Sequence, residues 1–178
     1  MERKLSVPDL HQTFLQALGP YVKSHSDISE KPLYVELAPP YCMTIKVFLF
    51  NCTNPPGARQ AGECKSQIIL PGQKRGERGH FEIESGVVTL LAGFASITES
   101  VEDGVFVIWE LKKHMEFAYS ANVQVSLNTL LRAYSEQMFS MKKRGNKEWI
   151  VVARPHKLAE AIQERVNVDI KLLLGELE

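Results

Sequence analysis

Several features are absent from this 178-residue sequence, and each absence excludes a class of protein. No apolar stretch is long enough to cross a bilayer, which takes about 20 residues in a helix. The N-terminus, residues 1–8, lacks the apolar segment of a secretory signal peptide. We therefore expect a soluble, cytoplasmic protein with no membrane partner.

A net charge is also absent, because 21 Lys and Arg balance 21 Asp and Glu. The chain is thus unlike histone-like proteins, which bind polyanions over much of their surface. If this protein binds nucleic acid, its positive charge must be gathered on one face. The sequence permits such a face, since Lys and Arg crowd residues 74–78, 112–113 and 142–147, whereas residues 99–103 and the last few are acidic.

Paired metal ligands are the third absence. The 3 cysteines, Cys42, Cys52 and Cys64, form no Cys-x-x-Cys pair and have no histidine at zinc spacing. We interpret them as buried or incidental thiols in a reducing compartment. The sequence therefore predicts neither a metal nor a cofactor.

Apolar patterns predict a mainly β fold with flanking helices. Near-continuous apolar runs indicate strands that are buried on both faces or closed into a barrel. The expected strands are residues 33–37, 43–50, 64–70, 87–95, 105–111, 122–125 and 149–153. Many short strands with few helices favour an open barrel of the Greek-key kind.

Three helices are expected beside these strands. Ser6 can N-cap the first, which Gly19 and Pro20 end. Apolar residues recur with helical spacing over residues 127–138, and Pro155 begins the third helix. The expected division is an N-terminal helix and connector, a barrel, and a C-terminal helix, at residues 1–30, 31–154 and 155–178.

Residues 71–81 concentrate hydrogen-bond donors on a glycine-rich backbone between two expected strands. Arg75 and Arg78 carry the planar fork that can pair with guanine O6 and N7. Gln73 could pair with adenine in the same way, and Glu77 could accept from cytosine N4. Such a loop suits a DNA groove, whereas the alternative interpretation is a solvated hairpin tip.

A second candidate segment, residues 112–124, has a basic start, two aromatic residues and a strand at its end. Ser120 and Asn122 suit hydrogen bonds to phosphates or base edges, and Phe117 and Tyr119 can stack or pack on sugars. In the alternative interpretation both aromatic residues belong to the core at the end of the barrel, and Ser120 and Asn122 cap a turn.

Together the two segments resemble the arms of B3-like DNA-recognition domains in restriction endonucleases, the group of EcoRII, BfiI and NgoAVII. The resemblance covers about residues 46–133. Residues 86–92 followed by 105–109 are similar to a strand pair of the EcoRII domain, and residues 122–133 are similar to the strand and helix after that domain's other arm. In this chain the strand and helix of residues 122–133 follow the strand pair instead of preceding it. This order of elements is most like that of NgoAVII.

The resemblance implies a seven-stranded open pseudobarrel, in the bacterial cytoplasm, that grips the major groove of double-stranded DNA at a specific short site. Residues 73–80 would form the first arm, and residues 112–124 the second. The implied DNA-binding residues are Gln73, Lys74, Arg75, Glu77, Arg78, His80, Lys112, Lys113, Tyr119, Ser120, Asn122 and Gln124.

Domains of this group are usually tethered to a separate nuclease domain, which in BfiI and NgoAVII is phospholipase-D-like. That nuclease's His-x-Lys motif does not occur in this sequence. The resemblance therefore implies no catalytic residue in this chain and cleavage by another domain. The helix after Pro155 would begin the connection to it.

The strongest alternative makes this chain the nuclease. Asp103, Glu110 and Lys112 fit the PD-(D/E)xK pattern, in which two acids bind magnesium and a lysine orients water. Glu110 and Lys112 lie two apart, hence on one face of a strand, and Gln124 follows a helix-length later. Against this, Asp103 and Gly104 form a typical turn pair, which would point Asp103 into solvent.

A third class is a protein-interaction module with no nucleic-acid role, which the balanced charge keeps open. Among the histidines, only His80 is expected near DNA, since it follows the loop glycine. The others show no metal spacing and are interpreted as solvated surface residues: His11, His25, His114 and His156.

Overall fold

The computed structural model describes residues 4–54, 62–98 and 100–178. The helices are α1 Val7–Leu18, α2 Leu127–Glu136 and α3 Leu158–Leu173. The strands are β1 Val22–His25, β2 Leu33–Leu37, β3 Thr44–Asn51, β4 Glu63–Ile68, β5 Gly79–His80, β6 Val87–Ala95, β7 Val105–Trp109, β8 Glu116–Phe117, β9 Ala121–Ser126, β10 Met138–Lys142 and β11 Trp149–Ala153. Short 3-10 helices are η1 Gly19–Tyr21, η2 Val101–Asp103, η3 Leu111–Lys113 and η4 Pro155–Lys157. Across these described ranges, no helix has the length and apolarity needed to cross a membrane.

A 7-stranded mixed sheet forms the centre of the fold, in the order β1-β2-β3-β6-β7-β11-β10. Within this sheet β3 and β6 pair parallel, and the other described pairs of neighbouring strands are antiparallel. The pairs β4–β9 and β5–β8 form two further, 2-stranded sheets. The mainly β prediction with flanking helices is confirmed, and no closed barrel is found in the described part of the chain.

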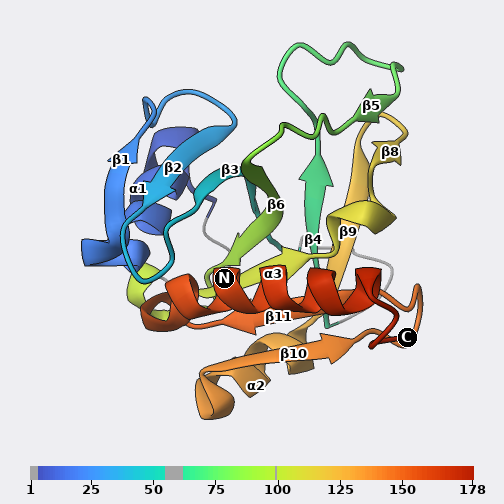
Figure 1. Ribbon diagram of the computed structural model, residues 1–178. Coiled ribbons are helices and arrows are strands. Elements are labelled where there is room, and N and C mark those ends of the chain that lie inside the picture. Colours follow the sequence, from blue (N-terminus) through green and yellow to red (C-terminus); the bar gives the residue numbers. More distant parts are fainter. Residues whose placement is uncertain (1–3, 55–61, 99) are drawn as a thin grey trace.

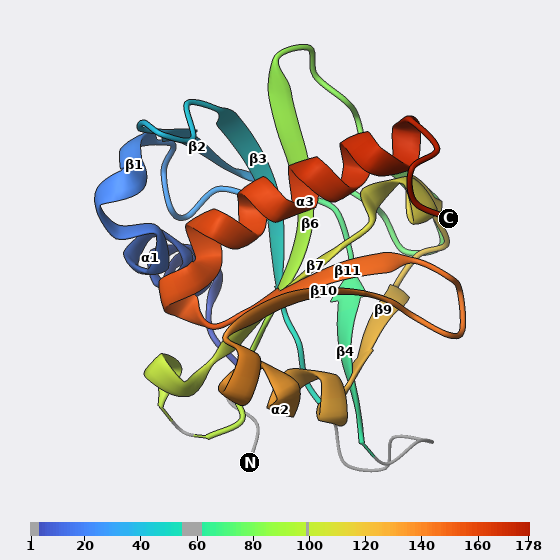
Figure 2. The same cartoon turned by 60° about the horizontal axis from the view of Figure 1, so that its bottom comes forward.

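Apolar layers cover both faces of the central sheet. On one face α1 and α3 pack through residues such as Phe14 and Ile162, and Figures 1 and 2 show α3 lying across the strands. On the other face β4, β9 and α2 pack through Val123 and Leu130 against Trp109. The central strands are therefore buried on both faces, which is one of the two arrangements that their apolar runs predict.

Several local predictions are confirmed at their boundaries. Ser6 N-caps α1, and its Oγ accepts a hydrogen bond from the backbone N–H of Asp9 at 3.3 Å. Gly19 ends this helix in the positive-φ region, at 56°. The strands expected at residues 33–37, 87–95 and 149–153 have those bounds in the structure.

Two predictions of local structure are wrong. The helix expected to reach Met138 ends at Glu136, because Gln137 has a left-handed φ of 67° and Met138 begins β10. The expected polar connector contains β1, which pairs with β2 at the edge of the sheet. Hydrogen bonding to a neighbouring strand thus overrides a weak local pattern in both places.

The interpretation of His11 as a surface residue is also wrong. This residue of α1 is fully buried, and its Nδ1 lies 2.7 Å from the backbone oxygen of Ile28. Burial lowers the pKa of His11, so the ring is neutral at physiological pH. His11 therefore contributes to packing between α1 and the segment before β2.

Candidate nucleic-acid interface

The two arms expected from the sequence lie side by side in the structure. β4 leads into the first arm and β9 ends the second, and these strands pair antiparallel; we call this pair the ribbon. Further along both segments, Gly79 lies opposite Phe117 and His80 opposite Glu116. Figure 1 shows both segments rising from the same end of the molecule. The arms are thus joined to each other twice, at the ribbon and at the β5–β8 pair.

An aromatic cluster fixes the junction between the arms. The ring of Phe117 lies 5.3 Å from that of Phe81, which is 5.0 Å from the ring of Phe48. Phe117 is buried, so it is a core residue, as the alternative interpretation held. A Cβ atom at Gly79 would overlap the Phe117 ring, which explains the need for glycine at this close approach.

Two polar side chains of the first arm hold the loop itself. Gln73 Oε1 accepts from the N–H of Leu70 at 3.0 Å, and its Nε2 donates to the Glu77 backbone oxygen at 2.8 Å. Glu77 Oε2 in turn accepts from the N–H of Lys74 at 3.0 Å. In this structure the amide and the carboxylate therefore shape the loop that presents the neighbouring cations.

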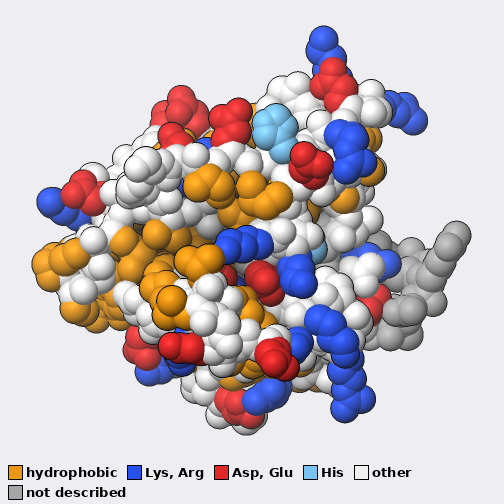
Figure 3. Space-filling model, turned by 45° about the vertical axis from the view of Figure 1, so that its right-hand side comes forward, with side chains coloured by type: hydrophobic (Ala, Val, Ile, Leu, Met, Phe, Trp, Pro, Cys, Tyr) orange, Lys and Arg blue, Asp and Glu red, His pale blue; other side chains and the backbone are white. Residues whose placement is uncertain are grey.

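The cations of both arms are exposed to solvent. They are Lys74, Arg75 and Arg78 on the first arm, and Lys112 and Lys113 on η3 in the second. None of them forms an ion pair with another described residue. Figure 3 shows Lys and Arg side chains on the projection at the top of the molecule, with Asp and Glu side chains among them. Unpaired cations on a projecting element are available to an anionic ligand.

The remaining predicted residues have different environments. His80 is exposed, and its Nε2 lies 3.7 Å from Glu82 Oε1. Tyr119 is half-buried, and Ser120 occupies a left-handed turn position with φ of 57°. Asn122 is exposed on β9, with the half-buried Gln124 two residues along the same face.

The outer face of the ribbon adds two residues that sequence reasoning missed. Lys65 lies opposite Gln124 and Gln67 opposite Asn122, while the residues between them along each strand are buried. The alternation of residues 64–68 was a signal that could have revealed them. Amide and ammonium groups are suited to base edges and phosphates, and a two-stranded ribbon fits the major groove.

Two hollows flank this face and share Asn122 in their walls. One has a volume of about 450 Å³ and contains Lys4, Lys31 and Lys65; we call it the lysine hollow. The other has a volume of about 510 Å³ and is bordered by residues 143–146 of the β10–β11 loop. The ribbon therefore forms a polar ridge between two recesses that both carry cations.

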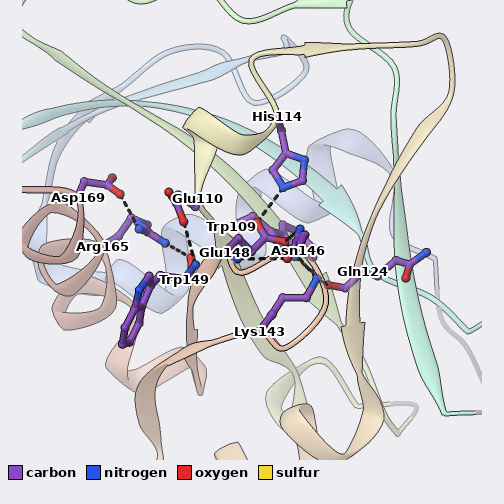
Figure 4. Close-up of polar contacts among 10 residues, drawn as sticks. All are labelled: Trp109, Glu110, His114, Gln124, Lys143, Asn146, Glu148, Trp149, Arg165 and Asp169. Carbon is purple, nitrogen blue, oxygen red and sulfur yellow. Dashed lines mark hydrogen bonds and ion pairs between the residues drawn. The ribbon is translucent and has the colours of Figure 1, made fainter. Parts of the chain in front are cut away.

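A buried carboxylate anchors the β10–β11 loop beside the second arm. Glu148 is fully buried and bonds to His114 Nε2 at 2.8 Å, Asn146 Nδ2 at 2.8 Å and Lys143 Nζ at 3.1 Å. Figure 4 shows these groups converging on Glu148. Burial alone would raise the pKa of Glu148, but the hydrogen bonds from His114 and Asn146 and the nearby positive charges lower it to about 2.

This network also changes the interpretation of two positions. His114 was expected to be a solvated surface residue, whereas it is half-buried and bonded to Glu148. Lys143 Nζ also donates to the Gln124 backbone oxygen at 2.8 Å, which ties the loop to β9. The basic loop is therefore held in a fixed position along the ribbon.

Asp103, Glu110 and Lys112 do not assemble the geometry of a magnesium-dependent nuclease. Asp103 and Glu110 flank β7 at opposite ends, and five strand residues span about 17 Å. Glu110 is buried and accepts from the N–H of Trp149 at 2.9 Å, while Lys112 lies on η3 rather than on a strand. The expectation that Glu110 and Lys112 share a strand face is wrong. No cluster of metal-ligating side chains occurs among the residues that the structure describes.

The fold and this surface define a small sheet-centred domain with a polar two-stranded ribbon and two projecting arms that carry exposed cations. A family model described as Methylase-associated X1 matches residues 43–162, which include the ribbon, both arms and the β10–β11 loop. The chain belongs to this family, which is associated with restriction-modification systems. Comparison with curated proteins and with solved structures gave no match.

Proposed function

We propose that this chain is a sequence-specific double-stranded DNA recognition domain of a restriction-modification system. The observation that carries the proposal is the union of both arms into one projection, whose exposed cations have no acidic partner among the described residues. The family association supports the biological setting. A B3-like pseudobarrel, most like that of NgoAVII, remains our proposal for the evolutionary class of the fold.

In this proposal the two arms have different roles. Arg75 and Arg78 read guanines in the major groove, because each guanidinium can donate two parallel hydrogen bonds to one base. Lys112 and Lys113 contact phosphates, and these contacts supply affinity that falls with salt. Gln73 and Glu77 act by holding the first arm in shape, since their side chains are bonded within it.

The ribbon extends the interface between the arms. Asn122 and Gln67 lie opposite each other on its outer face, and Lys65 lies opposite Gln124. Amide groups of Asn and Gln can pair with adenine N6 and N7. We infer that the ribbon face adds base contacts to those of the first arm.

Chemistry on the DNA belongs to a partner in this proposal. The groups of the nuclease pattern lie apart, so cleavage or methylation is assigned to a separate domain or subunit that acts where this domain binds. A recognition surface and a catalytic centre can lie in different chains, because each function depends on its own site.

A selection from random-sequence duplexes tests the proposal. The wild-type chain should enrich one short motif that contains at least one G·C pair. Arg78→Ala should lose discrimination at that pair, and Arg78→Lys should not restore it, because lysine keeps the charge without the planar fork. Absence of any enriched motif would overturn sequence-specific recognition, and absence of binding to any duplex, even at low salt, would favour a protein-interaction module.

A further inference from the structure

The lysine hollow borders the second arm at Asn122, but its lysines belong to neither predicted arm. Lys4 precedes α1, Lys31 precedes β2 and Lys65 lies on β4, so segments distant in the sequence bring three cations to one recess. Thr53, Gln67 and Asn122 add a hydroxyl and two amides to its wall. No carboxylate occurs among the described residues that line it. This donor-rich composition is that of an anion-binding site.

Lys31 is the most constrained cation of the hollow. Its side chain is half-buried, with Nζ 4.8 Å from the centre of the Phe50 ring, and burial lowers its pKa below the ordinary value. It has no ion-pair partner in the described part of the chain. Lys46 provides the contrast, because that buried ammonium lies 3.3 Å from Glu84 Oε2.

A half-buried ammonium has lost hydration, and among the described residues the Phe50 ring is the one group found to compensate Lys31. An anion in the hollow would restore the missing counter-charge at little cost, because the lysines are already gathered. A phosphate group has the required charge and offers several acceptor oxygens to Lys, Thr and amide donors.

The geometry points to a phosphate-binding site in the lysine hollow, with Lys31 as its main ligand and Lys4 and Lys65 beside it. The phosphate is one backbone group of the bound DNA, an assignment that rests on the proposed function. Asn122 and Gln67 belong both to this hollow and to the ribbon face. A phosphate held there would fix the backbone of one strand alongside the ribbon, and so set the register of base reading.

The first experiment measures how salt changes DNA affinity. Lys31→Met keeps the apolar stem on Phe50 and removes the charge. It should weaken binding to every duplex by about fivefold to tenfold and reduce the slope of log K against log salt by about one. Lys31→Arg should restore the slope. The matched control is Lys23→Met, which removes an exposed lysine on β1 that pairs with Glu36 and should change neither quantity. An unchanged slope for Lys31→Met would overturn the site.

The second experiment needs no DNA. Nitrogen-15 NMR of labelled lysine side chains, with the Lys31 signal assigned by its loss in Lys31→Met, follows titration with inorganic phosphate against chloride at equal ionic strength. The Lys31 signal should move and the Lys23 signal should not. Equal responses of the two lysines would contradict a phosphate-binding site in the hollow.

The two experiments separate the failures. If phosphate moves the Lys31 signal but no duplex binds, the hollow is a site for free phosphate and the proposed DNA recognition fails. If a motif is enriched but Lys31→Met keeps the full salt slope, DNA recognition stands and the phosphate assignment to this hollow fails.

Discussion

The basic side chains of the arms and those around Glu148 differ in their burial and in whether a carboxylate lies beside them. Arg75, Arg78 and Lys112 project into solvent without a described acidic partner, whereas Lys143 and His114 converge on a fully buried Glu148. The same residue types are therefore open to a ligand in one region and bonded within the fold in the other. The sequence shows only clusters of basic residues in both places, and the distinction depends on which of them meet an acid in the fold.

The largest effect is expected at the buried network. Glu148→Ala should lower the free energy of unfolding by about 3–5 kcal/mol, because Lys143 would remain partly buried without a counter-charge and His114 and Asn146 would lose their hydrogen-bond partner. Denaturant titration of the wild type and the variant measures this difference. The control Glu136→Ala removes an exposed carboxylate paired with Arg132 and should change stability by less than about 1 kcal/mol. Equal losses for the two variants would contradict a structural role for the Glu148 network.

The pH dependence of stability sharpens the same point. The pKa of Glu148 is about 2 in the folded chain, below its ordinary value of 4.5. Its ionised form therefore stabilises the fold fully above about pH 4.5, and this contribution is lost as the pH falls towards 2. Acid titration of unfolding should show a steeper loss for the wild type than for Glu148→Gln between these values. Parallel curves would show that the carboxylate is not stabilised by folding.

Removing an arm cation should change DNA discrimination and leave stability unchanged, unlike removing Glu148. Arg75→Ala and Arg78→Ala should leave the free energy of unfolding within about 0.5 kcal/mol of the wild type, because both side chains are exposed. Each should lower discrimination between the selected duplex and one with a substituted G·C pair by about 1–3 kcal/mol. Competition binding measures discrimination. A variant that loses stability instead of discrimination would place the residue with the folding cations.

Lys112→Ala should have the smallest effect. Its loss removes one exposed charge on η3, so all duplexes should bind more weakly by a similar factor, with a salt slope smaller by about one. Fluorescence titration over a range of salt concentrations, with specific and non-specific duplexes in parallel, measures both quantities. A selective loss on the specific duplex alone would assign base reading to this residue.

Local patterns predicted a large part of the fold. β6 and β11 have apolar runs, and β2 has an alternating pattern, whose ends coincide with the strands. The N-cap of α1 follows from Ser6. β1, β5 and β8 could not be predicted, because they are short or exposed strands that exist through pairing with distant partners. The parallel β3–β6 contact is likewise a property of the tertiary structure.

The candidate site was predicted less completely than the fold. Clusters of basic residues located both arms, and the alternation of residues 64–68 could have added Lys65 and Gln67. No local pattern connects His114 with Glu148, which lie 34 positions apart and meet only in the folded chain. The sequence also gives no signal for Lys31, because the residues that line the hollow with it are distant in the sequence.

The most direct measurement is the amide NMR spectrum of the labelled chain during titration with a mixed-sequence DNA duplex. The account predicts that signals from residues 73–80, 112–124 and the outer face of β4 shift together and return when salt is raised. Signals from α3 and β1, on other parts of the molecule, should stay in place. Shifts confined to α3 or β1, with the arms unchanged, would contradict the assignment of the joined arms as the DNA-binding surface.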